Sequence, residues 1–296
     1  MFGSNSYLGL TTHPKVKIAS ENAIKKYGSS VAGSRLLNGT TDLHIELEHR
    51  LACFLNKEAA LLFTTGFQVN LGVIPSITQP NDSIILDRLN HASIIEGARL
   101  SKAPYVMFKH NDMISLEQKL QQSADAEMRL IVVDGVFSME GDLADLKGIT
   151  QLAKQYNAVV MSDCAHAIGV IGEYGAGAAS HFDVEDQVDL IGGTFSKSLA
   201  SIGGFIASDA HTVEYIKHNS RSLVFSASPT PASVAAALAS LDIIESDDSL
   251  RLQLLKNTEY AIAAFNSLGF DTGKTETPII PLFIKDDKKT HEMAML

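Results

Sequence analysis

The residues VVMSDCAHAIGVIGEYGAG at positions 159–177 begin with a short apolar run, 159–163, that ends in Asp163 and is followed three residues later by His166. The run is rich in β-branched residues and lacks polar alternation, as in a strand that is covered on both faces. Ligands collect at the carboxyl ends of the strands of an open parallel sheet. This stretch therefore predicts an α/β fold with a polar site where the strand ends.

Six further apolar runs of the same kind occur in the chain, and helical patterns separate several of them. The seven predicted strands are 60–64, 83–87, 105–108, 130–134, 159–163, 188–192 and 204–207. The helical patterns between them are 43–55, 68–77, 115–122 and 146–156. Alternation of strand and helix over this length predicts a seven-stranded, mostly parallel sheet with helices on both faces.

The pattern changes after residue 207. Helices are predicted at 212–219, 232–244 and 250–268, and a strand at 278–284. We expect a remnant of an N-terminal segment at 1–12, a large domain at 13–225, and the start of a small, incomplete α+β domain at 226–296. Both ends are interpreted as cuts through a longer architecture, and the final residues KKTHEMAML as a helix that has just begun.

Composition narrows the class of protein. The 24 basic and 34 acidic residues give a formal net charge of −10, which argues against broad binding to nucleic acids or anionic membranes. Cys53 and Cys164, the two cysteines, cannot form a disulfide framework. No apolar run approaches the roughly 20 residues that span a bilayer, and the first residues lack a signal-peptide pattern. We expect a cytoplasmic protein without a transmembrane segment.

Lys197 is the first candidate for chemistry. It lies in GTFSKS (193–198), after a predicted strand, among the hydroxyls of Thr194, Ser196 and Ser198. A desolvated lysine forms Schiff bases with carbonyl compounds, whereas an ordinary surface lysine is the alternative. Asp163 could provide an acidic group in the same crevice. The alternative for this residue is a helix cap, with His166 a core histidine.

Two more polar groups follow strand ends. In TTGFQVN (64–70) the chain passes through Gly66 into a helix, and the backbone amides at a helix start can hold a phosphate. A simple turn is the alternative there. In DRLNHAS (87–93), His91 could stack on a planar ring or cap a helix.

Together these groups indicate pyridoxal phosphate (PLP). This cofactor needs a lysine, an acid for its ring nitrogen and a phosphate cradle. A carboxylate such as Asp163 keeps the ring nitrogen protonated, because an opposite charge favours the charged form. The His and Cys spacings lack zinc character, so no metal site is expected, and neither G-x-G-x-x-G nor a P-loop occurs.

The chain also resembles the α-oxoamine synthases, a subgroup of the fold-type I PLP enzymes. The similarity occurs in family order over nearly the whole chain. The matching stretches are SNSYLGL (4–10), GSRLLNGT (33–40), LFTTGFQVNLG (62–72), LDRLNHASI (86–94), VDGVFSMEGD (133–142), SDCAHAIGVIGEYGAG (162–177) and GTFSKSLASIGGF (193–205).

The resemblance implies roles around the cofactor ring. Lys197 resembles the Schiff-base lysine, which also acts as the acid/base for the α-proton. Asp163 resembles the partner of the ring nitrogen, and His91 the residue stacked on the ring. His166 and Ser138 resemble hydrogen-bond partners near the phenolic oxygen of the cofactor.

The resemblance also implies roles at the phosphate and at the substrate. The residues that resemble phosphate contacts from the same subunit are Gly66, Phe67, Thr194 and Ser196. Ser226 resembles a phosphate contact donated across a dimer interface, so a homodimer with shared active sites is implied. Asn5 lies in a segment that the family places near the substrate.

The implied reaction is a decarboxylative condensation of an amino acid with an acyl-CoA. GTFSKS resembles the lysine motif of bacterial serine palmitoyltransferases, which favours L-serine and palmitoyl-CoA as substrates and 3-ketosphinganine, CoA and CO2 as products. The alternatives are a glycine or alanine C-acyltransferase of the 8-amino-7-oxononanoate synthase or 2-amino-3-ketobutyrate CoA ligase type, and a non-catalytic partner subunit or inactive fragment. Retention of Lys197 favours an enzyme. The family arginine that clamps the amino-acid carboxylate is expected beyond residue 296.

Overall fold

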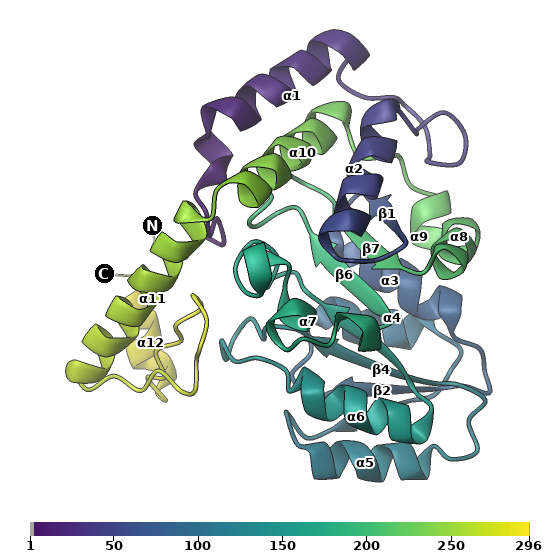
Figure 1. Ribbon diagram of the computed structural model, residues 1–296. Helices are drawn as coiled ribbons and strands as arrows, with labels where there is room; N and C mark the ends of the chain where they lie inside the picture. Colours follow the sequence, from purple (N-terminus) through teal and green to yellow (C-terminus); the bar gives the residue numbers. More distant parts are fainter. Residues whose placement is uncertain (1–2, 296) are drawn as a thin grey trace.

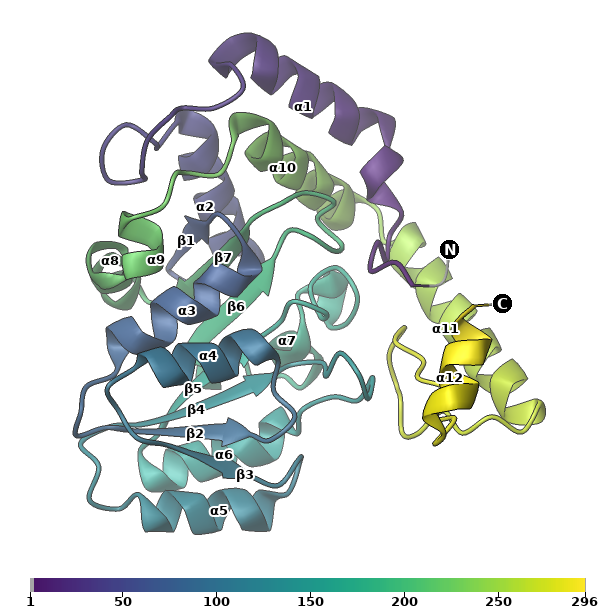
Figure 2. The same cartoon turned by 180° about the vertical axis from the view of Figure 1, so that it is seen from behind.

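The computed structural model describes residues 3–295, and its centre is one seven-stranded sheet (Figures 1 and 2). The strand order is β1-β7-β6-β5-β4-β2-β3. Only β7 runs antiparallel to its neighbours, so the predicted mostly parallel sheet is confirmed. The strands are β1 (Ala59–Phe63), β2 (Ser83–Asp87), β3 (Tyr105–Phe108), β4 (Arg129–Asp134), β5 (Val159–Asp163), β6 (Leu190–Thr194) and β7 (Gly204–Ser208).

Helices cover both faces of the sheet (Figure 1). The α-helices are α1 (Pro14–Tyr27), α2 (Asp42–Phe54), α3 (Gly66–Ile77), α4 (Ala92–Leu100), α5 (Met113–Gln122), α6 (Leu146–Tyr156), α7 (Ala178–His181), α8 (Ala210–Asn219), α9 (Arg221–Val224), α10 (Pro231–Ser246), α11 (Ser249–Ser267) and α12 (Asp287–Ala294). The predicted helices fall on α2, α3, α5, α6, α8, α10 and α11, with end points that differ by at most two residues.

Strand β2 shows why the apolar runs lack polar alternation. All five of its residues are buried. Ile85 belongs to the apolar cluster that includes residues of α2, α5, α6 and α10, whereas Ile84 and Leu86 belong to the cluster on the other face with α3, α4 and α8. Successive side chains of a strand point to opposite faces, so the central residues of a strand covered on both sides are all apolar.

The predicted strand at 278–284 is wrong. Within residues 3–295 this segment pairs with no strand, and it lies instead beside the loop after β4. The Thr277 hydroxyl donates to the carbonyl oxygen of Gly141 at 2.8 Å, and Ile279 packs on the main apolar cluster. A segment that is apolar because it packs on the core has the same sequence pattern as a buried strand. A strand, however, also needs a hydrogen-bonded neighbour.

After α9 the described part of the chain adds no further strand to the sheet. Helix α10 lies along α1 and also contacts α2, and α11 then leads away to α12 (Figures 1 and 2). The domain boundary at residues 225–226 stays a prediction. None of the helices in residues 3–295 combines the length and apolarity that a membrane crossing requires.

Candidate active site

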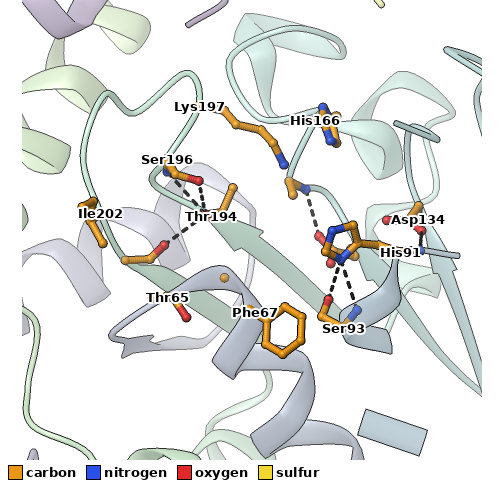
Figure 3. Close-up of a pocket in the computed structure, with 14 residues that line it drawn as sticks. Thr65, Phe67, His91, Ser93, Asp134, His166, Thr194, Ser196, Lys197 and Ile202 are labelled. Carbon is orange, nitrogen blue, oxygen red and sulfur yellow. Dashed lines mark hydrogen bonds between the residues drawn. The ribbon is translucent and has the colours of Figure 1, made fainter. Parts of the chain in front are cut away.

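A cavity of about 290 Å³ opens where β4, β5 and β6 end and α3 begins (Figure 3). The predicted strand-end residues Asp163, His166, Lys197 and His91 meet there. The lining residues are Thr65, Gly66, Phe67, His91, Ser93, Asp134, Asp163, Ala165, His166, Thr194, Ser196, Lys197, Ile202 and Gly203. The carboxyl edge of a parallel sheet is the expected place for a ligand.

Asp163 is the last residue of β5 and is buried. Its two oxygens each accept a hydrogen bond: Asn70 Nδ2 donates to Oδ2 at 2.7 Å, and the Ala165 amide donates to Oδ1 at 3.0 Å. Hydrogen bonds to a carboxylate favour its charged form. Asp163 is therefore built to carry a negative charge inside the cavity.

Lys197 follows β6. Its side chain points into the cavity, with Thr194 on one side of it and His166 on the other (Figure 3). Burial lowers the pKa of its ammonium, and the charges of Asp163 and Asp134 oppose this shift. A lowered pKa increases the fraction of neutral amine at neutral pH, and the neutral amine is the nucleophile. The position is suited to covalent attachment of a carbonyl compound.

His166 lies in the turn after β5 and is buried against Tyr7. Tyr7 Oη and His166 Nδ1 are 2.6 Å apart. Burial, together with the charges of Lys197 and His91, lowers the pKa of His166 to about 3, so its imidazole is neutral at pH 7. A neutral imidazole keeps one N–H donor and one acceptor, and the bond to Tyr7 fixes the ring orientation.

His91 combines the two functions considered for it. As the N-cap of α4, its Nδ1 accepts the Ser93 amide at 3.2 Å, while its ring also lines the cavity. The ring meets Phe67 edge to face, with centroids 6.4 Å apart. Its backbone amide donates to Asp134 Oδ2 at 2.6 Å, which ties the loop before α4 to the end of β4.

On the opposite side of the cavity, backbone amides at the start of α3 are available as hydrogen-bond donors. The lack of a side chain at Gly66 leaves room beside them. Thr65 accepts the amides of Gln68 and Val69, which leaves the amides of Gly66 and Phe67 at the start of α3. A Cβ on Gly66 would lie only 2.7 Å from the Thr194 Cβ. This edge of the cavity is thus shaped for an anion close to the backbone.

These features fit PLP. The Lys197 amine matches the aldehyde of that cofactor, the Asp163 carboxylate its ring nitrogen, and the start of α3 with the Thr194 and Ser196 hydroxyls its phosphate. The three chemical groups lie on separate parts of one cavity, as a planar molecule with three different substituents requires.

Three predicted site residues lie outside the lining of this cavity. Asn5 is exposed in the segment before α1, and Ser138 lies in the loop after β4. Ser226 accepts a hydrogen bond from Gln68 Nε2 at 3.2 Å on the outer side of α3. Their roles stay predictions.

Sequence reasoning missed several residues of the site, among them Asp134, Asn70 and Tyr7. Asp134 ends β4 just as Asp163 ends β5, so the strand-end criterion could have found it. Asn70 and Tyr7 gave no comparable signal, because their importance depends on contacts with residues 93 and 159 positions away.

Comparisons with known proteins identify relatives of the chain over nearly its whole length. The chain is 54% identical to a serine palmitoyltransferase of Sphingobacterium spiritivorum over 98% of this chain and 73% of that protein. It is 44% identical to an 8-amino-7-oxononanoate synthase of Thermoanaerobacter pseudethanolicus, over 98% and 74% of the two chains. A solved serine palmitoyltransferase from S. paucimobilis with bound PLP superimposes with a TM-score of 0.95 and 34% identity, covering 98% of this chain and 76% of that one. Residues 1–295 match the aminotransferase class I and II family, and the chain belongs to that family.

Proposed function

We propose that this chain is a PLP-dependent acyltransferase that condenses L-serine with palmitoyl-CoA and releases 3-ketosphinganine, CoA and CO2. The proposal rests on one observation. Lys197, Asp163 and His166 line the same cavity, and the start of α3 forms another side of that cavity. Identity of 54% to a serine palmitoyltransferase, against 44% to an 8-amino-7-oxononanoate synthase, favours serine as the amino acid.

The residues would hold the cofactor at three points. The Lys197 amine would bind its aldehyde carbon, and the Asp163 carboxylate would hold a proton on its ring nitrogen. The amides of Gly66 and Phe67, with the hydroxyls of Thr194 and Ser196, would bind the phosphate. When bound, PLP withdraws electrons from the α-carbon of an amino acid, which allows proton loss and decarboxylation there.

The remaining side chains would prepare the site for that chemistry. The His91 ring would cover one face of the cofactor, and neutral His166 would form a hydrogen bond to its phenolic oxygen. Released from the cofactor, the Lys197 amine, whose pKa burial lowers, is suited to accept and return the α-proton near neutral pH.

The roles that concern other parts of the assembly follow the same proposal. Ser138 would lie near the phenolic oxygen and Asn5 near the substrate. Ser226 would reach the phosphate of a partner subunit in a homodimer. Residues 226–296 would belong to a smaller C-terminal domain, and the enzyme would act in the cytoplasm on sphingolipid precursors.

The second candidate is a glycine or alanine C-acyltransferase of the 8-amino-7-oxononanoate synthase type. The relative from Thermoanaerobacter pseudethanolicus covers the same 98% of this chain, which favours a shared scaffold. The two candidates differ in the amino acid and the acyl chain, whereas the roles of Lys197 and Asp163 are the same in both.

The test is the release of CoA thiol from palmitoyl-CoA by the purified chain with PLP, given L-serine, glycine or L-alanine. We expect release with L-serine to be at least about ten-fold faster than with the other two, because a site that binds a hydroxyl rejects analogues that lack it. Lys197→Ala should abolish release, and the matched variant Lys154→Ala, on the exposed face of α6, should retain it.

Each other outcome has a defined meaning. Fastest release with glycine or alanine would replace the serine proposal by the second candidate. No release with any amino acid, in a chain that binds PLP, would contradict catalysis by this chain and favour a non-catalytic partner subunit or an inactive fragment.

A further inference from the structure

Asp134 and Asp163 form a pair of carboxyl groups at one edge of the cavity. They are the last residues of β4 and β5, and they lie opposite each other in the register of these parallel strands. Both are buried, and both line the cavity. Adjacent strands are about 4.8 Å apart, so two negative charges here would repel strongly in a poorly solvated site.

The two carboxyl groups have different hydrogen-bond partners. Asp163 accepts from Asn70 Nδ2 and from the Ala165 amide, one donor for each oxygen. Asp134 accepts at Oδ2 from the His91 amide, its one donor within the described part of the chain. Donors stabilise a carboxylate, so the environment favours the charge on Asp163 and the proton on Asp134.

We propose that this cavity holds a mixed acid pair at neutral pH, with Asp163 as the carboxylate and Asp134 as a neutral carboxylic acid. The charged groups around Asp134 agree with this assignment. Burial, the Asp163 charge and the more remote Asp87 raise the pKa of Asp134, and the His91 amide and Lys197 only partly offset them, so its pKa is well above the ordinary value.

The consequence for function rests on the proposed function of the site. With Asp134 neutral, the cavity presents one negative charge, on Asp163, to the ring nitrogen of PLP. A second carboxylate beside it would compete for the Lys197 ammonium and hold that amine in its protonated form. Asp134 is then a positioning residue, which fixes the loop of His91 through the 2.6 Å bond to its amide.

Infrared difference spectroscopy of the cofactor-free chain tests the assignment directly, because a protonated carboxyl group has a C=O stretch that a carboxylate lacks. At pH 7 we expect one such acid band in the wild-type chain and its loss in Asp134→Asn. In Asp163→Asn the band should titrate at a lower pH than in the wild-type chain, because the Asp163 charge that raises the pKa of Asp134 is gone. Asp82→Asn is the matched control, because Asp82 is also buried but accepts two backbone amides, from Gln79 and Met128, which stabilise its carboxylate.

Absence of an acid band from the wild-type chain at pH 7 would overturn the proposal, whether or not the variants fold. Its survival in Asp134→Asn would also overturn it, because the proton would then be on another group. The wild-type band should persist between pH 6 and 7, although an ordinary aspartate with a pKa of about 3.9 is ionised there. The measurement uses neither cofactor nor substrate, so failure of the proposed function would leave it unaffected.

Discussion

Tyr7 Oη lies 2.6 Å from Nδ1 of His166, although 159 positions separate the two residues in the chain. Their rings meet edge to face, with centroids 6.1 Å apart and an interplanar angle of 67°. Burial raises the pKa of the Tyr7 phenol, so both partners of the bond are neutral at pH 7. The orientation of His166 in the cavity therefore depends on the segment that precedes α1.

His166 should make the protein less stable in mild acid. Burial, helped by the charges of Lys197 and His91, lowers its folded-state pKa from 6.5 to about 3. Because the unfolded chain binds this proton and the folded chain does not, stability falls as the pH decreases from 6.5 toward 3. Urea unfolding of His166→Gln should show a smaller loss between pH 6.5 and 4 than the wild-type chain.

His44 is the comparison for this experiment. Burial, with the charge of Arg35, lowers its pKa to about 4, so His44→Gln should flatten the same part of the curve independently. If the free energy of unfolding has the same pH dependence in the wild-type chain and in His166→Gln, the folded chain binds the His166 proton at the same pH as the unfolded chain. That result would contradict the lowered pKa.

His110 should have the opposite pH dependence. Burial opposes its positive charge, but hydrogen bonds to Asp142 at 2.9 Å and Asp87 at 3.0 Å outweigh it and raise the pKa to about 10. A raised pKa contributes stability that is complete below 6.5 and is lost as the pH rises toward 10. His110→Gln should cost about 1.5–3 kcal/mol at pH 6, the range for hydrogen bonds to charged groups.

The same substitution should lower the free energy of unfolding much less at pH 10 than at pH 6. Urea unfolding at the two pH values measures this difference. His211→Gln on α8, an exposed position, is the matched control and should change neither value. An equal cost of His110→Gln at pH 6 and pH 10 would contradict an imidazolium held between the two carboxylates.

Gly66→Ala should damage the proposed phosphate cradle. The added Cβ would lie 2.7 Å from Thr194 Cβ and 2.8 Å from Thr194 Oγ1, so the start of α3 must move. We expect the Kd for PLP, from absorbance titration, to rise at least about ten-fold, or 1.4 kcal/mol. Gly192→Ala in β6 is the control, because its Cβ would make only ordinary contacts at 3.7 Å or more. Equal Kd values for the two variants would contradict this function of Gly66.

Asp163→Asn should affect turnover more than cofactor retention. The amide keeps the size of the side chain and removes the charge that would hold a proton on the ring nitrogen. We expect kcat to fall by about 100-fold or more, a loss typical of a removed electrostatic group, with a smaller change in the Kd for PLP. Steady-state kinetics and absorbance titration on the same preparation measure both quantities. Near-normal kcat would show that this charge is dispensable.

The fold and the centre of the site could be predicted because both depend on local pattern. Buried strands such as β2 and β5 have a consecutive apolar run, and the polar residues with which they end mark the sheet edge. Asp163, His166 and Lys197 were found in this way. The segment 278–284 was misjudged for the same reason, because packing alone makes it apolar while a strand also requires a partner.

Other roles, inside the site and outside it, depend on contacts between distant segments. His110 is an ordinary histidine in the sequence, and only the fold places it between Asp87 and Asp142. Asn70 looks like any polar residue on a helix until α3 brings it to Asp163. Such roles follow from tertiary neighbours, which the spacing of residues along the chain does not specify.

The central claim is that the Lys197 amine binds PLP in this cavity. The most direct measurement is borohydride reduction of the chain with PLP, followed by mass spectrometry of its peptides. The account predicts a single major cofactor adduct, on Lys197, and none on the Lys197→Ala variant. An adduct on another lysine, or one that persists in Lys197→Ala at the wild-type level, would contradict it.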